Sequence, residues 1–346
     1  MKRGIAISLA VAIAAAVTAI IYFATRKHEG YSTVPSIFLS IASFRDDRCS
    51  KTLEEAFSKA ANPKNLVVGV CEQNDKSDEM CLRKPVKDGE VRVTSIPADM
   101  ATGPCTARER ISRLYQGEDI FMQVDAHTIF APNWDTLVRK AWKERPVDKA
   151  VLTTYPQAST SNFEDDVPVL TALWFPDKSA PNEVLQKCET HVKPGQYSMS
   201  RSTAGGCLIM AGQTLKDVPY DPSLTNLFNG EEILYGARLY THGYDLLSVP
   251  YNIIKHEYDD TSSNLKSGPK FQPGFSSDKG SIHAWDILRG TYSTEKSRSS
   301  RDRGHGLGNA RSGDAFFHYV GLDPGTMTSE SSAEWFKKNG VITSRT

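Results

Sequence analysis

Short apolar runs alternate with segments of helical periodicity along most of the chain. Runs typical of buried strands cover residues 36–43, 65–71, 91–96, 119–124, 151–155, 204–210 and 246–249. Apolar residues at helical spacing cover residues 50–61, 106–115, 134–143 and 231–241. This alternation predicts an α/β fold with a mostly parallel central sheet, in which ligands bind at the carboxyl ends of the strands.

Polar segments become longer in the second half of the chain. Residues 157–166, 176–182 and 193–201 are rich in polar and turn-forming residues and are expected to be loops. Residues 261–313 are rich in Ser, Gly, Arg and Lys. We expect this stretch to be partly mobile or to form a lid that orders on a ligand.

The first 35 residues differ from the rest of the chain. Residues 4–24 are uncharged and would span roughly 30 Å as a helix, which is the thickness of a bilayer core. They predict a transmembrane signal anchor, with residues 1–3 as a short tail and 25–35 as a stem. The alternative is a cleaved signal peptide, although its apolar region usually has about 7–15 residues. Basic residues on both sides leave the orientation open.

Composition excludes several classes of protein. The 346 residues include 41 Lys+Arg and 41 Asp+Glu, so the net charge gives no general attraction to nucleic acid. The hydrophobic fraction, 39%, is that of an ordinary globular protein. Six cysteines occur without a C-x-x-C pair, which argues against structural zinc. A lumenal body would allow disulfides, with Cys71 and Cys81 as the candidate pair, and six free thiols are the alternative.

An acid and an imidazole follow the strand predicted at 119–124. Asp125 and His127 are two residues apart, so in an extended backbone they point to the same side and could bind one cation. His256 follows another apolar segment and would complete a set that suits Mn²⁺. The alternatives are a capped strand-end loop and a structural histidine. His242 is better explained as a cation at the end of a helix.

Three other segments carry candidate binding residues. Glu231 and Glu232 open a helix, where the helix dipole favours acids, or they turn into a cleft to bind sugar hydroxyls. Arg108 lies in the first turns of a helix after a Gly-Pro turn and faces a phosphate or pairs with a neighbouring acid. Ser43, Phe44 and Arg45 follow the first strand and could hold a nucleotide, with a solvated turn as the alternative reading.

Taken in order, four segments resemble the glycosyltransferase (GlcNAc) family, glycosyltransferase family sixty. They are SIFLSIASFRDDRCSKTLEEAFSKAANPKNLVVGVCEQND, GPCTARERISRLYQGEDIFMQVDAHTIFAPNWD, FNGEEILYGARLYTHGYDLLSVP and GLGNARSGDAFFHYVGLD. The resemblance runs from residue 36 to 323. It implies a GT-A type, Rossmann-like domain over residues 36–325, followed by a tail at 326–346.

The resemblance also implies a function. It implies a retaining transferase that moves GlcNAc from UDP-GlcNAc onto a hydroxyl of a protein (hydroxyproline, Ser or Thr) or a glycan. UDP-GalNAc, UDP-Glc or UDP-Gal as donor, a non-catalytic sugar-nucleotide-binding protein and a nucleotide-sugar hydrolase are the alternatives. The expected location is a single-pass, type II membrane protein of the Golgi or ER, and a viral origin is also open. No nucleic-acid partner is expected.

The family motif assigns roles to residues of this chain. The usual D-x-D is replaced by Asp125-x-His127. Mn²⁺ would be held by Asp125, His127 and His256. The carboxylates expected in catalysis are Glu231 and Glu232. The residues expected at the donor are Ser43, Phe44, Arg45, Arg108 and Asp125. The segment from Gly306 to Arg311 is expected near the acceptor or in a lid.

Overall fold

The computed structural model describes residues 34–176, 183–258 and 277–342. The predicted anchor at 4–24 lies outside these residues. Within the described ranges, none of the helices has the length and hydrophobicity that a bilayer span requires. Residues from Ser36 onward form one compact unit.

Seven strands form the central sheet of this unit. They are β1 (Ile37–Phe44), β2 (Leu66–Asn74), β3 (Glu90–Pro97), β4 (Ile120–Asp125), β6 (Ala150–Thr153), β11 (Cys207–Ala211) and β12 (Asp245–Ser248). Their order is β12-β6-β11-β4-β1-β2-β3. All neighbouring pairs are parallel except the two that include β11, which is antiparallel to both β4 and β6. The prediction of a mostly parallel α/β sheet is confirmed.

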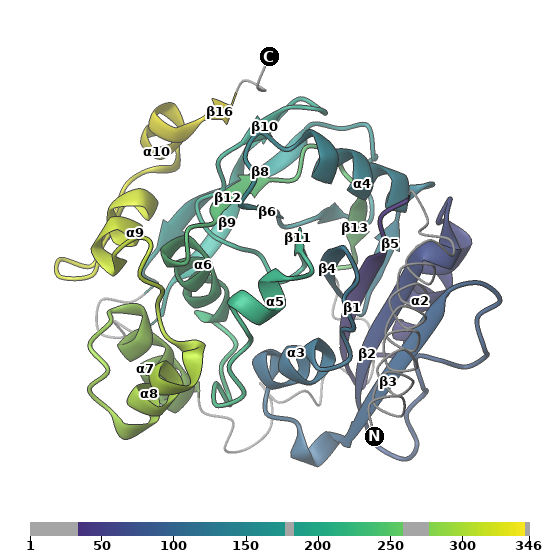
Figure 1. The fold of residues 1–346 in the computed structure, drawn as a ribbon. Coiled ribbons are helices and arrows are strands. Elements are labelled where there is room, and N and C mark those ends of the chain that lie inside the picture. The colour runs from purple at the N-terminus through teal and green to yellow at the C-terminus, as the bar shows by residue number, and fades with distance from the viewer. Residues whose placement is uncertain (1–33, 177–182, 259–276, 343–346) are drawn as a thin grey trace, which may run out of the picture. The chain divides into compact units, whose positions relative to one another are not determined.

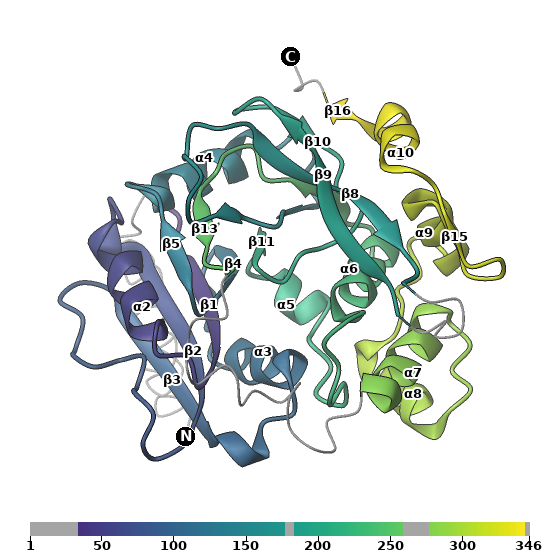
Figure 2. The same ribbon diagram turned by 180° about the vertical axis from the view of Figure 1, so that it is seen from behind.

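Helices cover both faces of the sheet, as Figures 1 and 2 show. One face carries α2 (Cys49–Ser58) and α4 (Trp134–Glu144), and the other carries α3 (Pro104–Ser112), α5 (Thr214–Asp217) and α6 (Glu231–Thr241). Alternate residues of β1 supply the two cores: Phe38 packs with α3 and α6, whereas Ile37 and Leu39 pack with α2 and α4. Burial on both faces explains the continuous apolar runs in the sequence.

Two smaller sheets flank the carboxyl ends of the central strands. The first contains β5 (Thr128–Phe130), β13 (Ile254–His256) and β7 (Gln157–Ala158), with β13 in the middle. The antiparallel pairing of β13 with β5 places His256 opposite Thr128, next to His127. The second is the hairpin of β8 (Val167–Trp174) and β9 (Leu185–Val192). Sequence reasoning did not predict this hairpin.

The C-terminal part is more helical than the sequence suggested. It contains α7 (Ser277–Leu288), α8 (Glu295–Ser300), α9 (Gly313–Val320), α10 (Ser332–Asn339) and the short strands β14 (Leu322–Asp323), β15 (Thr328–Ser329) and β16 (Val341–Ile342), of which β16 pairs with β10 (Tyr197–Ser198). Much of the described part, 277–313, of the stretch that we expected to be partly mobile or a lid is therefore helical, and its role as a lid stays a prediction. Residues 261–276 lie outside the described residues.

The residues assigned to a C-terminal tail are packed in their described part, 326–342. Trp335 of α10 is fully buried, and its indole N–H donates to the backbone oxygen of Tyr319 at 2.6 Å. The buried guanidinium of Arg201 donates to the backbone oxygens of Val320, Thr171 and Glu330. These contacts join the end of the chain to β8.

The one disulfide among the described residues joins Cys49 to Cys81, so the candidate pair of Cys71 with Cys81 is wrong. Cys71 lies on β2 and faces the core that includes α3 and α6. Cys49 and Cys81 lie in the opposite core, on the α2 side. Sequence proximity was misleading, because alternate residues of a strand point to opposite faces of the sheet.

Candidate functional site

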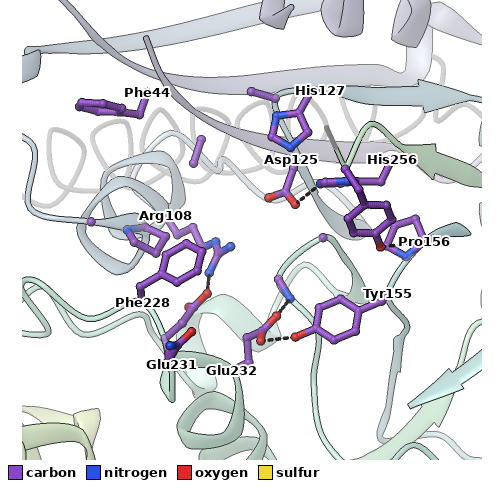
Figure 3. Close-up of a pocket in the computed structure, with 18 of the residues that line it drawn as sticks. Phe44, Arg108, Asp125, His127, Tyr155, Pro156, Phe228, Glu231, Glu232 and His256 are labelled. Atoms are coloured by element: carbon purple, nitrogen blue, oxygen red, sulfur yellow. Dashed lines mark hydrogen bonds and ion pairs between the residues drawn. The ribbon is translucent and has the colours of Figure 1, made fainter. Parts of the chain in front are cut away.

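A pocket of about 550 Å³ opens at the carboxyl ends of the central strands. Its walls include residues at the ends of β1, β2 and β4 and at the start of α6. This volume lies within the usual range for small-molecule sites, and the position is the one that open α/β sheets use for ligands. Figure 3 shows two groups of polar side chains in it, one around Asp125 and one at Glu231 and Glu232.

The first group is the metal cluster, defined as Asp125, His127 and His256. One ligand atom from each residue lies within 4.8 Å of the others. Nε2 of His256 lies 3.1 Å from Oδ2 of Asp125, and the two imidazole centroids are 4.4 Å apart. Burial alone would raise the pKa of Asp125, but the hydrogen bond and charges of the histidines hold it below its ordinary value. One carboxylate and two imidazoles form a donor set that suits Mn²⁺.

A buried carboxylate holds the second nitrogen of His127. Nδ1 of His127 lies 2.6 Å from Oδ2 of Asp46, a residue that is 4% exposed. If Nδ1 carries the proton in this contact, Nε2 keeps its lone pair for a cation. A carboxylate behind a histidine ligand is a common arrangement at metal sites. The residues of the metal cluster therefore fit a divalent cation.

The second group is the carboxylate pair, defined as Glu231 and Glu232, the first two residues of α6. Oε1 of Glu231 forms an ion pair with Arg108, whose side chain points from α3 into the pocket. Burial alone would lower the pKa of Arg108, but the charge of Glu231 and the hydrogen bond to it raise it above its ordinary value. The ion pair of Arg108 with Glu231 thus keeps a guanidinium and a carboxylate side by side in the pocket.

Glu232 accepts hydrogen bonds at both oxygens. Oε2 accepts from the hydroxyl of Tyr155 and from Nε2 of Gln186, the latter at 2.8 Å, and Oε1 accepts from the backbone N–H of Gly205 at 2.5 Å. Burial and the neighbouring charge of Glu231 nevertheless raise the pKa of Glu232 to about 7. Near neutral pH this carboxyl can therefore accept a hydrogen bond or donate one to a bound hydroxyl.

Two glycines lie between the groups. A Cβ on Gly205 would come within 2.6 Å of Nη2 of Arg108, and a Cβ on Gly206 would come within 3.1 Å of Oδ2 of Asp125. Only glycine lets the backbone approach both side chains so closely. The chain here forms the floor that connects the metal cluster to the carboxylate pair.

Comparison with known proteins identifies the family. The sequence model of the family described as Glycosyltransferase (GlcNAc) matches residues 36–89 and 83–270, which is more than half of the chain. The chain belongs to this family. It is therefore a glycosyltransferase. No curated protein sequence matches the chain.

Solved structures show the fold. GalNAc-T7, solved with UDP, GalNAc and Mn²⁺, matches with a TM-score of 0.55 at 14% identity, over 89% of this chain and 57% of its own. The mannosyltransferase PcManGT from Pyrobaculum calidifontis, in complex with GDP-Man and Mn²⁺, gives a TM-score of 0.47 at 13% identity, over 98% and 91% of the two chains. At such an identity the likeness to GalNAc-T7 shows the GT-A fold alone. The present chain covers 57% of the length of the GalNAc-T7 chain.

The structure brings most of the predicted site residues of the glycosyltransferase into one pocket. Phe44, at the end of β1, lines the pocket and lies in Figure 3 on the side away from His256. Ser43 is fully buried and does not line the pocket. Arg45 does not line it either, because its guanidinium pairs with Asp78 at 2.8 Å and with Asp75 at 3.2 Å. Ser43 is thus enclosed in the core and Arg45 is held at the β2–β3 loop, and their contact with a nucleotide stays a prediction.

Two further predictions concern the C-terminal end of α6, and the acceptor or lid role of the first stays a prediction. The segment from Gly306 to Arg311 packs on the C-terminal end of α6, where Gly308 N–H donates to Oγ1 of Thr241 at 2.8 Å. That end lies about 15 Å from Glu231, given the rise of an 11-residue helix. Burial lowers the pKa of His242, which disfavours its assignment as a cation at the helix end.

Sequence reasoning missed several pocket residues of the glycosyltransferase. Asp46 and Arg48 follow β1, Tyr155 follows β6, Gln186 lies on β9, and Gly205 precedes β11. Asp46 belongs to the polar turn after the first strand that was a candidate nucleotide site, but no contact with His127 was predicted for it, and the Gly-Gly step before a strand was a second signal. Nothing in the sequence indicated Gln186, because the hairpin that carries it was not predicted.

Proposed function

We propose that this glycosyltransferase moves GlcNAc from UDP-GlcNAc onto a hydroxyl of a protein (hydroxyproline, Ser or Thr) or glycan acceptor, with retention. The observation that carries the proposal is one pocket with the metal cluster at one end and the carboxylate pair at the other. A nucleoside diphosphate needs a cation, and a sugar needs hydrogen-bonding groups. The family description supports GlcNAc, and GalNAc-T7, solved with UDP, GalNAc and Mn²⁺, supports a UDP-sugar and manganese.

The metal cluster would hold the cation. Asp125, His127 and His256 supply the ligands, and Asp46 supports His127 from behind. A bound Mn²⁺ would act as a Lewis acid that stabilises negative charge on the leaving diphosphate. Phe44 lies on the side of the pocket away from His256, where it could stack on the uracil base of the donor.

The carboxylate pair would hold the sugar. Arg108 with Glu231, and Glu232 with its donors, present fixed charges and hydrogen-bonding atoms at the other end of the pocket. Such preorganised groups stabilise charge that develops as the sugar–phosphate bond breaks. They also select a donor that is rich in hydroxyls.

Both carboxylates are already engaged, which disfavours either as a covalent nucleophile. Glu231 is paired with Arg108, and Glu232 accepts three hydrogen bonds. We therefore propose that the acceptor oxygen attacks the anomeric carbon on the face from which UDP leaves. The C–O bond to the diphosphate breaks, the new C–O bond forms, and the hydroxyl proton passes to the departing diphosphate.

The cellular location is part of the proposal. The apolar run at 4–24 supports a single-pass, type II anchor in the Golgi or ER, with the described residues in the lumen. The Cys49–Cys81 disulfide agrees with this, because disulfides persist in oxidising compartments.

The test is UDP release by the full-length protein in detergent. The donors are UDP-GlcNAc, UDP-GalNAc, UDP-Glc and UDP-Gal, each with Mn²⁺ or EDTA and with or without hydroxyproline, Ser and Thr peptides or a glycan. We expect Mn²⁺-dependent release from UDP-GlcNAc that one acceptor stimulates. Release that no acceptor stimulates would indicate a hydrolase. No release from a folded, UDP-binding protein would contradict the proposed reaction.

A further inference from the structure

The turn between β1 and α2 lies directly behind the metal cluster. Asp46 in this turn is buried and lies 2.6 Å from Nδ1 of His127. Its other oxygen, Oδ1, accepts hydrogen bonds from the backbone N–H of Arg48 at 3.0 Å and from Nε of Arg48 at 3.2 Å. Both oxygens are thus assigned, one to Arg48 and one to His127.

This assignment fixes the proton on the imidazole. Because Asp46 is an acceptor at both oxygens, Nδ1 of His127 must donate, so Nε2 of a neutral ring carries the lone pair. A metal ion binds the lone pair, and the hydrogen bond behind the ring sets its orientation. The contact that links Asp46 to the metal cluster is thus the one to His127.

Arg48 links the same turn to the strand that carries the second histidine. Its Nη1 lies 3.5 Å from Oε2 of Glu257, the residue after His256. The backbone N–H of Glu257 in turn donates to the backbone oxygen of His127 at 3.2 Å. The two histidine segments are thus held by one another and by the turn after β1.

Contacts on the outer side hold the turn itself in place. Cys49, at the start of α2, is cross-linked to Cys81. Arg45 pairs with Asp78 of the same β2–β3 loop at 2.8 Å. The turn is therefore fixed on one side to the β2–β3 loop and on the other side to His127.

From these contacts we propose that Asp46, braced by Arg48, is a positioning residue that holds His127 in the tautomer and orientation required for a divalent cation. The proposal rests on the proposed metal role of the cluster. The loss of such a supporting group typically weakens metal binding by about 10–100-fold.

Asn and Ala at position 46 should weaken Mn²⁺ binding to different extents. In Asp46→Asn the donors of Arg48 still require an oxygen, so the amide NH₂ turns toward His127. Nδ1 must then accept, and the proton moves to Nε2, where it blocks the metal. Asp46→Ala removes the partner without forcing this tautomer. We therefore expect Asp46→Asn to bind Mn²⁺ more weakly than Asp46→Ala, although Asn is closer in shape to Asp.

The experiment titrates the full-length protein with Mn²⁺ alone and follows free Mn²⁺ by electron paramagnetic resonance. Asp47→Asn is the matched control, since it removes the same charge one residue along and Asp47 does not line the pocket. We expect Kd to rise by about 10–100-fold in Asp46→Asn and to stay within twofold in Asp47→Asn. Asp46→Glu, which keeps the charge but displaces it by one methylene, should give an intermediate loss.

A second readout uses the metal-free protein. Nitrogen-15 shifts of the imidazoles report which nitrogen carries the proton, and the His127→Gln spectrum assigns the signal. The wild-type protein should show Nδ1–H at His127, and Asp46→Asn should show Nε2–H. An unchanged tautomer with an unchanged Mn²⁺ Kd would overturn the role of Asp46 alone. A wild-type protein that binds no Mn²⁺ would overturn the proposed metal site and, with it, this role.

Discussion

The buried charges at the two ends of the pocket have different kinds of partner. At the carboxylate pair, each acid meets donors that the protein itself supplies: Arg108 for Glu231, and Tyr155, Gln186 and a backbone N–H for Glu232. At the metal cluster, a carboxylate and two imidazoles converge within 4.8 Å. A divalent cation bound between them would be held by all three side chains together.

This difference predicts different sensitivities. On the proposed function, the metal end would depend on an added ion, so the loss of one ligand would remove the interaction with the diphosphate as a unit. The hydrogen bonds and the ion pair of the carboxylate end are made without a ligand, so a substitution there would affect both the stability of the protein and the proposed binding of the sugar. Mutations at the two ends should therefore separate metal dependence from folding stability.

Asp125→Asn should have the largest effect on turnover. The amide keeps the shape but loses the charge that would bind the proposed cation, and a loss of about 4 kcal/mol of transition-state stabilisation corresponds to roughly 1000-fold. UDP release from UDP-GlcNAc with Mn²⁺ measures the effect, and the melting temperature should change little. Turnover within tenfold of wild type would remove Asp125 from the metal site.

Glu231→Gln should reduce both activity and stability. It leaves the buried guanidinium of Arg108 without its carboxylate, and breaking a buried pair costs roughly 3–5 kcal/mol. We expect a clearly lower melting temperature and kcat/KM reduced by about 100-fold. The control is Glu109→Gln, which removes an i,i+4 helix pair whose arginine, Arg113, is exposed, and it should change stability by less than about 1 kcal/mol. Equal effects of the two variants would contradict the account of this end.

Glu232→Gln should change how stability depends on pH. The folded protein raises the pKa of Glu232 from 4.5 to about 7, so between these values the folded state binds more protons than the unfolded state. Wild-type stability should therefore fall as pH rises through this window, by about 2–3 kcal/mol from this group. Urea unfolding from pH 4.5 to 8 should show that Glu232→Gln lacks this decrease. A parallel decrease in both proteins would show that Glu232 titrates normally.

Arg45→Ala should have the smallest effect. Arg45 pairs with Asp75 and Asp78 outside the pocket, and such partly exposed pairs contribute about 0–1 kcal/mol. The Kd of UDP with Mn²⁺, measured by calorimetry, should change by less than about twofold. A tenfold weaker Kd would restore the role that the sequence pattern suggested for this residue.

The sequence predicted those parts of the site that lie close together along the chain. Asp125 and His127 are two residues apart at the end of a strand, and Glu231 and Glu232 open a helix, so local pattern was enough to select them. His256 was chosen from its setting after an apolar segment. Its place beside His127 follows from the pairing of β13 with β5, which no local pattern encodes.

Most strands of the central sheet were predictable because they are buried on both faces and appear as apolar runs, whereas the edge strand β3 is largely half-exposed. The hairpin of β8 and β9 was not predicted: β8 is a buried, largely apolar run that we did not recognise as a strand, and β9 alternates between half-exposed and exposed residues and gives no such signal. Missing the hairpin also meant missing Gln186. The disulfide prediction was wrong for a related reason: Cys71 was chosen because it is close to Cys81 in sequence, without regard to the face of β2 on which it lies.

The central claim is that the metal cluster couples nucleotide binding to a divalent cation. Calorimetric titration of UDP into wild-type protein and Asp125→Asn, each with Mn²⁺ or with EDTA, tests it most directly. The account predicts that Mn²⁺ tightens UDP binding at least tenfold in the wild type, about 1.4 kcal/mol, and not in the variant. Equal tightening in both proteins, or none in the wild type, would contradict it.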